Sequence, residues 1–212
     1  ARLARVPYLA VTGTNGKTTT TGLLAASLRA AGLDAVACGN IGRAFPTTAR
    51  EHHDVLVVEA SSFQLATQES FRPRVSVLLN LAPDHLDWHG SFEAYAAAKA
   101  RIFARQGPGD VHVGNRDDEG AAAVSRSAPC EVRWFTTGEP SAQDAGVRDG
   151  RLVAGWSGAD LVRVSIGTRA MFANYAVVQT IGHNIANANT EGYSRQQVEF
   201  ETAQGQFTGA GF

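Results

Sequence analysis

The sequence has few cysteines, little net charge and no long hydrophobic run. Cys38 and Cys130 are the only cysteines among 212 residues. They lie far apart and lack the spacing of metal ligands, so we expect a reduced cytosolic protein. The formal net charge of −1 gives no electrostatic reason to expect a nucleic-acid partner. No apolar stretch reaches the length of a membrane span, and no signal peptide leads the chain, so we expect no membrane partner.

The composition is that of an ordinary soluble domain. Apolar residues make up 44% of the chain and charged residues 18%. A chain of this length can form one good core or two small ones. The first predicted strand begins within a few residues of Ala1, so we expect the sequence to be a piece of a longer polypeptide.

A glycine loop near the start of the chain is the feature around which most of the sequence is organised. Tyr8 to Val11 predicts a buried strand, residues 13–16 (Gly-Thr-Asn-Gly) a tight turn, and Lys17 with Thr18 the start of a helix. A strand, a glycine loop and a helix N-terminus in this order form a phosphate site. Lys17 would reach the outer phosphates and the Thr18 hydroxyl would hold Mg²⁺. The loop is the short form, because Val11 stands where a longer loop has its first glycine.

Apolar strands alternate with helices through the first 130 residues. Strands are predicted at Asp34–Ala37, Val55–Glu59, Arg74–Asn80 and Val111–Val113, and helices at Thr19–Ala31, Ser61–Ala66, Ser91–Arg105 and Asp117–Ser125. Residues 38–42 predict a turn, residues 44–52 an irregular or helical connector, and residues 131–164 a small hairpin region. The pattern predicts an α/β fold: a mostly parallel sheet with the glycine loop at its edge and helices on both faces.

Polar side chains follow the predicted strands and converge on the carboxyl edge of the sheet. Glu59 would hold Mg²⁺ or the attacking group, or would be a solvated loop acid. His85, between Asp84 and Asp87, would ligate a metal, orient phosphate, or be an ordinary loop histidine. Lys99 lies in an alanine-rich helix, where a lone lysine is usually solvated.

Five strings in order along the chain supply a context for these residues. They are Thr12-Gly13-Thr14-Asn15-Gly16-Lys17-Thr18-Thr19, Gly39-Asn40-Ile41-Gly42, Glu59-Ala60-Ser61-Ser62-Phe63-Gln64-Leu65, Asn80-Leu81-Ala82-Pro83-Asp84-His85-Leu86-Asp87 and Ala97-Ala98-Lys99. Together they resemble the central ATP-binding domain of the Mur ligase superfamily, the ATP-dependent amide-forming enzymes of peptidoglycan synthesis. The resemblance covers about residues 6–164. The second and third strings resemble the D-glutamate-adding branch of the family, rather than a folylpolyglutamate synthase, which shares the loop.

The resemblance implies roles for individual residues. ATP phosphates would lie on the loop formed by Gly13, Thr14, Asn15, Gly16, Lys17, Thr18 and Thr19. One Mg²⁺ would be held by Thr18 and Glu59, and a second by His85 and by Lys99, which is carbamylated in this family. Asn40 and Ser61 match positions near the substrate, and Lys17, Glu59, His85 and Lys99 would form the catalytic set.

The resemblance also implies a reaction and its substrates. The carboxylate of UDP-N-acetylmuramoyl-L-alanine attacks the γ-phosphate of ATP to give an acyl phosphate. The amine of D-glutamate then attacks the acyl carbon and phosphate leaves. Family members have an N-terminal domain for UDP and a C-terminal domain for D-glutamate, so we expect this chain alone to bind ATP·Mg²⁺ weakly and to lack complete ligase activity.

The last quarter of the chain has a different character. Residues 168–189 predict one long helix, followed by an irregular, Gln- and Gly-rich tail. The string Gly182-His183-Asn184-Ile185-Ala186-Asn187-Ala188 matches a Mur ligase segment that contacts adenine. With its flanks, it also resembles the N-terminus of flagellar axial proteins of the hook–filament junction. We favour the second interpretation, because it accounts for the residues on both sides of the string, and it makes the chain a chimera of residues 1–164 and 165–212. The second part would make contacts with flagellar axial proteins, outside the cell if exported.

Overall fold

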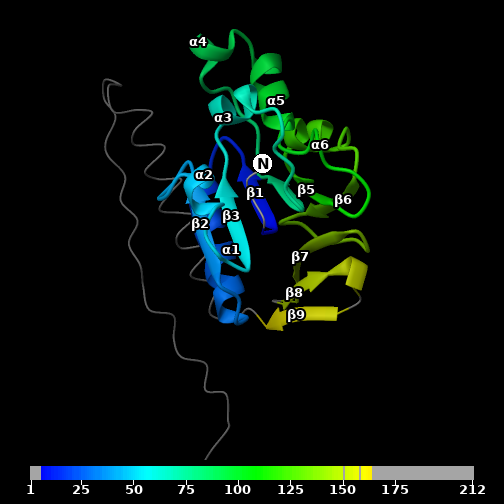
Figure 1. The fold of residues 1–212 in the computed structure, drawn as a ribbon. Coiled ribbons are helices and arrows are strands. Elements are labelled where there is room, and N and C mark those ends of the chain that lie inside the picture. The colour runs from blue at the N-terminus through cyan, green and yellow to red at the C-terminus, as the bar shows by residue number, and fades with distance from the viewer. Residues whose placement is uncertain (1–5, 150, 158, 164–212) are drawn as a thin grey trace, which may run out of the picture. The chain divides into compact units, whose positions relative to one another are not determined.

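A computed structural model describes residues 6–149, 151–157 and 159–163 (Figure 1). The chain divides into two units, residues 1–161 and 162–212, and the description below concerns the first. The long helix and tail predicted after residue 165 lie outside the described residues. So does the proposed junction near residue 164, and the chimera therefore stays a prediction.

The first unit is built on one extended, mostly parallel sheet. Its strand order is β2-β3-β1-β4-β5-β6-β7-β8-β9, and every pair from β2 to β7 is parallel. The β7–β8 pair is antiparallel. The strands are β1 (Tyr8–Thr12), β2 (Ala35–Gly39), β3 (Val55–Glu59), β4 (Val75–Leu78), β5 (Val111–Asn115), β6 (Glu131–Phe135), β7 (Asp144–Arg148), β8 (Arg151–Ala154) and β9 (Ala159–Arg163).

Helices cover both faces of the sheet, as the sequence predicts. The helices are α1 (Lys17–Ala30), α2 (Phe45–Thr48), α3 (Ser62–Thr67), α4 (Leu86–His89), α5 (Phe92–Ala100) and α6 (Glu119–Ser125), with a 3₁₀ turn η1 at Gly155–Ser157. Ala10 and Val58 lie on one face of β1 and β3, in a cluster with Leu65 of α3 and with Ile102. Helix α1 packs on β1, β2 and β3 but adds no residue to this cluster, so it covers the opposite face.

The predicted strands and helices are found, with corrections at their ends. Helix α1 begins at Lys17, as the glycine loop predicts, with Gly16 as its N-cap. Strand β2 continues to Gly39, so the predicted turn at residues 38–42 loses its first two residues to the sheet. The expected helix over residues 91–105 is too long: α5 ends at Ala100. Beyond it, Ile102 and Phe103 donate to carbonyls three residues back, which tightens the chain and turns both side chains into the core.

Two further corrections concern the region around α4 and the end of the unit. The sequence analysis missed α4, a four-residue helix that starts from a left-handed His85 (φ +51°). The predicted hairpin region at residues 131–164 begins with two strands, β6 and β7, that extend the parallel sheet instead of pairing as a hairpin. The antiparallel strands β7 and β8 form a hairpin, as expected.

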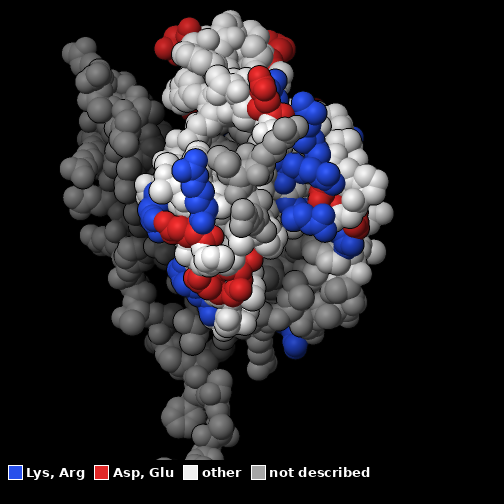
Figure 2. All heavy atoms as spheres, viewed as in Figure 1, with Lys and Arg blue, Asp and Glu red and all other residues white. Residues whose placement is uncertain are grey.

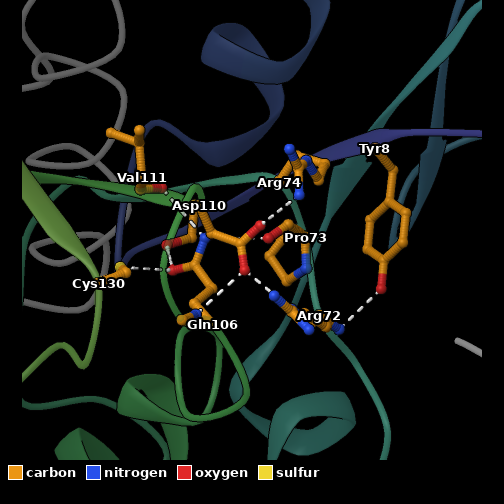
Figure 3. Close-up of polar contacts among 10 residues, drawn as sticks. Tyr8, Arg72, Pro73, Arg74, Gln106, Asp110, Val111 and Cys130 are labelled. Carbon is orange, nitrogen blue, oxygen red and sulfur yellow. Dashed lines mark hydrogen bonds and ion pairs between the residues drawn. The ribbon is translucent and has the colours of Figure 1, made fainter.

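A charge network around the buried Asp110 ties β4 to β5 at their amino ends, away from the glycine loop (Figure 3). The Asp110 side chain is fully buried and accepts hydrogen bonds from Nε of Arg72 at 2.8 Å and from Nη1 of Arg74 at 3.1 Å. Gln106 lies beside it and donates to the carbonyls of Pro73 and Val111. These contacts fix the edge of the sheet opposite to the candidate site.

Candidate functional site

The glycine loop joins β1 to α1 and passes close to the end of β4. Gly16 has a φ of +81°, in the left-handed region that glycine adopts at little cost. A Cβ on Gly13 would lie 2.9 Å from the Cβ of Leu79, so a larger residue could not pass the end of β4 at this distance. Both loop glycines therefore have a physical reason to be glycine.

The N-terminus of α1 presents uncapped amide groups to the loop. The first N–H groups of a helix have no acceptor within the helix, and no side chain caps this end of α1. The helix has 14 residues, and its dipole places partial positive charge at Lys17, Thr18 and Thr19. This end of the helix has the donors and the potential that a phosphate group requires.

Lys17 folds back over the loop. Its Nζ donates hydrogen bonds of 2.9 Å to the carbonyl oxygens of Gly13 and Thr14. Burial lowers the pKa of the Lys17 amine, while the carboxylates of Glu59 and Asp84 act in the opposite direction. A phosphate oxygen is a stronger acceptor for an ammonium group than a carbonyl is, so a bound nucleotide would draw Lys17 away from these carbonyls.

Glu59 ends β3 beside the first turn of α1. Its side chain is 2% exposed, and each carboxylate oxygen has one partner. The Thr18 hydroxyl donates to Oε2 and the Asn40 amide donates to Oε1, both at 2.9 Å. The structure thus brings together the two predicted Mg²⁺ ligands, Thr18 and Glu59, at hydrogen-bond distance.

The loop after β4, which contains Asn80 and Ala82, is hydrogen-bonded to the glycine loop. The Asn80 side chain accepts from the Asn15 amide at 2.8 Å and donates to the Asn15 carbonyl at 3.1 Å. The Thr14 hydroxyl bonds the backbone of Ala82 and lies 2.9 Å from the hydroxyl of Tyr95. The sequence analysis missed Tyr95, although its position four residues before Lys99 places both on one face of α5.

Lys99 lies under the glycine loop rather than in solvent. Its side chain is 2% exposed, its Nζ donates to the Gly13 carbonyl at 2.8 Å, and the ammonium lies 4.7 Å from the centre of the Tyr95 ring. Burial, and then the charge of Lys17, lower the pKa of Lys99 to about 7. The chain contains only two lysines, and both donate to the carbonyl of Gly13.

His85 and its neighbours form the outer wall. The imidazole is half exposed, with Nε2 3.5 Å from Oδ2 of Asp84. The ring of Phe63 lies 4.8 Å away between ring centres and also contacts Trp88 and His89 of α4. The short helix α4 and its left-handed start place His85 at the rim of the site.

One pocket of about 140 Å³ brings together Lys17, Asn40, Ser61, His85 and Lys99 of the predicted residues, and its lining comes from five parts of the chain. Its lining is Lys17, Asn40, Ser61, Ser62, Phe63, Asp84, His85, Tyr95 and Lys99. Ser61 reaches it as the N-cap of α3, where its hydroxyl accepts from the Gln64 amide in a capping box. A second pocket of about 220 Å³ lies between α2 and α3, and Glu59 is the one predicted residue that lines it.

The oxygen donors at this site fit a hard cation. Thr18 and Glu59 supply hydroxyl and carboxylate oxygens, and Mg²⁺ completes its shell with water and substrate phosphates. In the part of the chain that the structure describes, no three His, Cys, Asp or Glu side chains group closely enough to hold a metal by themselves. Lys99 is a hydrogen-bond donor as it stands, so it fits a metal only after conversion to an anionic carbamate.

Charges away from the pocket are mixed in sign. On the face in Figure 2, basic and acidic side chains lie near one another. Ion pairs in the β5–β8 region join Arg116 to Asp144, Arg133 to Glu131 and Arg148 to Glu139. None of the helices in the described part of the chain has the length and apolarity of a membrane span.

Comparison with known proteins assigns the fold and the loop to one family. The profile of the Mur ligase middle domain matches residues 11–190, well over half of the chain. The chain belongs to the Mur ligase family. The match includes residues 165–190 and so overlaps the segment with the flagellar resemblance, which lies outside the described residues and stays a prediction.

Curated relatives of this Mur ligase middle domain are D-glutamate ligases. The UDP-N-acetylmuramoylalanine–D-glutamate ligase of Mycobacterium tuberculosis (strain ATCC 25177 / H37Ra) is 50% identical over 147 residues, which are 69% of this chain and 29% of that protein. The ligase of the same name from Pelotomaculum thermopropionicum is 46% identical over 156 residues, 73% of this chain and 34% of that protein. The chain thus spans about a third of the length of these relatives.

Solved structures agree on the fold. A UDP-N-acetylmuramoyl-L-alanyl-D-glutamate–2,6-diaminopimelate ligase aligns with a TM-score of 0.55 and 27% identity, over 68% of this chain and 34% of that chain. The MurF ligase of Thermotoga maritima in complex with ADP aligns with a TM-score of 0.53 and 22% identity, over 70% of this chain and 37% of that chain. The predicted Mur ligase α/β fold is confirmed.

Proposed function

We propose that this chain is the ATP-binding part of a ligase that adds D-glutamate to UDP-N-acetylmuramoyl-L-alanine. The substrate carboxylate attacks the γ-phosphorus of ATP, ADP leaves, and an acyl phosphate forms. The amine of D-glutamate then attacks the acyl carbon, phosphate leaves, and the amide bond is made. The reaction consumes ATP, and together with the two free cysteines this favours the cytoplasm.

The residues of the pocket have distinct roles in this proposal. The α1 N-terminus and the loop amides hold the phosphates, and Lys17 moves from the Gly13 and Thr14 carbonyls to a phosphate oxygen. Thr18 and Glu59 hold Mg²⁺, which when bound neutralises charge on the transferring phosphate. Asn40 and Ser61 line the same pocket, and in this proposal they contact the substrate.

Lys99 and His85 form the second cation site of the proposal. At a pKa of about 7, a large fraction of Lys99 is the neutral amine at neutral pH, which is the form that reacts with carbon dioxide. The resulting carbamate supplies the oxygen donors that a hard cation requires. Lys99 is buried directly beneath the loop, so this charge would form beside the phosphates.

One observation carries the proposal: Lys17, the Thr18–Glu59 pair and Lys99 come from three separate elements and meet at one glycine loop. Lys17 and Lys99 share an acceptor in that loop, and Thr18 lies one residue beyond Lys17. The identity of 46–50% to named D-glutamate ligases supports this substrate class over that of a folylpolyglutamate synthase.

The proposal predicts that ATP binding depends on Lys17. We expect the chain to bind ATP with Mg²⁺, and Lys17→Ala to weaken binding about 10- to 100-fold, the value of a lost hydrogen bond to a charged group. Isothermal titration calorimetry at fixed ionic strength measures both affinities.

The matched control is Arg105→Ala, which removes an exposed positive charge that does not line the pocket. It should bind ATP as the unsubstituted chain does. Equal affinity of the unsubstituted chain and Lys17→Ala, or no detectable ATP binding, would contradict the proposal.

A further inference from the structure

The turn that follows β2 holds Asn40 against the Glu59 carboxylate. The backbone N–H of Asn40 donates a hydrogen bond of 2.9 Å to the main-chain carbonyl of Glu59. The side-chain nitrogen of Asn40 donates a second hydrogen bond, also of 2.9 Å, to Oε1 of the same residue. Two hydrogen bonds to one residue fix both the backbone and the side chain of Asn40 relative to Glu59.

The chain around Asn40 is built for this close approach. Gly39 pairs with Glu59 in the sheet, and a Cβ on Gly39 would lie only 2.4 Å from the Glu59 carbonyl oxygen. Gly42, with a φ of +58°, turns the chain so that the Arg43 carbonyl accepts from the Gly39 amide at 2.9 Å. The string Gly-Asn-Ile-Gly therefore closes a small turn whose polar side chain lies over the carboxylate.

The Glu59 carboxylate needs a hydrogen-bond donor to fix its orientation, because rotation about the last side-chain torsion of a glutamate is weakly restricted. The final torsion of a glutamate side chain has broad, two-fold minima, so packing alone orients its oxygens poorly. Donors on both oxygens, Thr18 on Oε2 and Asn40 on Oε1, fix the carboxylate plane. Asn40 is uncharged, so it orients Glu59 without neutralising the negative charge that a cation would meet.

We propose that Asn40 is a positioning residue that orients the Glu59 carboxylate toward a nucleotide-bound divalent cation. When a cation draws the Thr18 oxygen, the bond from Thr18 to Glu59 is lost, and Asn40 remains as the donor that holds the carboxylate. This role is additional to a place near the substrate, and it rests on the proposed function because the cation arrives with ATP.

The test compares ATP affinity with and without Mg²⁺ for four proteins: the unsubstituted chain, Asn40→Leu, Asn40→Gln and the control Ile41→Ala. Leucine has nearly the shape of asparagine but no donor, and Ile41 lies in the same turn and has no polar group in its side chain. The Mg²⁺-dependent gain is the factor by which Mg²⁺ increases the affinity for ATP. We expect this factor to be about tenfold smaller in Asn40→Leu than in the unsubstituted chain, while the affinity for ATP without Mg²⁺ is unchanged. Ile41→Ala should keep both, and Asn40→Gln, which retains the donor, should keep part of the gain.

A double variant separates this role from a general effect on folding. In a Glu59→Gln background, Asn40→Leu should cause no further loss of the Mg²⁺-dependent gain, because no carboxylate remains there for Asn40 to orient toward the cation. If Asn40→Leu does not fold, the Mg²⁺-dependent gain is measured for Asn40→Gln instead. The double-variant comparison with Glu59→Gln is then made with Asn40→Ser. An unchanged Mg²⁺-dependent gain in Asn40→Leu, or an additive loss in the double variant, would overturn the inference. Absence of ATP binding by the unsubstituted chain would instead overturn the proposed function.

Discussion

At the residue scale, the site depends on close approaches between backbones that a sequence does not reveal. The sequence predicts Glu59 and the loop glycines from the strand–loop–helix order. It does not predict that Asn40 bonds Glu59 or that Tyr95 bonds Thr14, because these partners lie 19 and 81 positions apart and meet only in the folded sheet. Asn40 was expected near the substrate, and its contact with Glu59 is the new information.

Gly39 provides a stability test at this scale. Gly39→Ala should destabilise the fold by about 3 kcal/mol or more, from strain at φ +107° and from the 2.4 Å approach to the Glu59 carbonyl oxygen. Gly32→Ala is the matched control, because Gly32 has a similar φ of +88° but no atom within 4 Å of the added Cβ. It should cost only about 1–2 kcal/mol. Urea unfolding of both variants gives the two values, and equal costs would show that the approach at Gly39 does not matter.

At the element scale, the sequence predicts the parallel sheet well and the helix ends less well. Continuous apolar runs such as Val55–Glu59 give the strands, since strands covered on both faces need no polar alternation. The end of α5 was misplaced because Ile102 and Phe103 continue the helical pattern, while the core draws the chain into a tighter turn. Helix α4 was missed because its four residues are too short for a periodic signal.

A buried histidine joins three of these elements. His112 of β5 lies 2.7 Å from the Ser76 hydroxyl of β4 and 2.9 Å from the Ser125 hydroxyl of α6, and it is fully buried. Desolvation lowers its pKa to about 3. Below the unfolded-state pKa of about 6.5 the unfolded chain binds a proton that the folded chain does not, so folding stability falls as the pH is lowered.

The proton linkage at His112 predicts that the free energy of unfolding depends on pH, and that His112→Gln reduces this dependence. Between about pH 6 and 4, His112 should contribute about 1.4 kcal/mol of lost stability per pH unit, and His112→Gln should lack this contribution while keeping the response of all other groups. The free energy of unfolding, measured in urea at pH 6, 5 and 4, gives the two slopes. Parallel slopes would show that His112 does not remain neutral in the folded chain.

At the scale of the whole molecule, the glycine loop and the loop after β4 that is hydrogen-bonded to it lie at one edge of the sheet. The opposite edge carries the Asp110 network with Arg72 and Arg74. The five ordered strings were sufficient to predict the family, because four of them begin at or just after a strand end and the fifth, in α5, places Lys99 under the glycine loop. Residues 164–212 lie outside the described part of the chain, and the flagellar resemblance there stays a prediction.

The central claim is that ATP with Mg²⁺ binds at the glycine loop. Hydrogen–deuterium exchange of the chain with and without ATP·Mg²⁺ tests it directly. We predict slower exchange in residues 13–19 and 80–85, and no change in residues 72–74 and 110, at the far edge of the sheet. Unchanged exchange in residues 13–19 under saturating ATP, with protection at the α2–α3 pocket instead, would contradict the account.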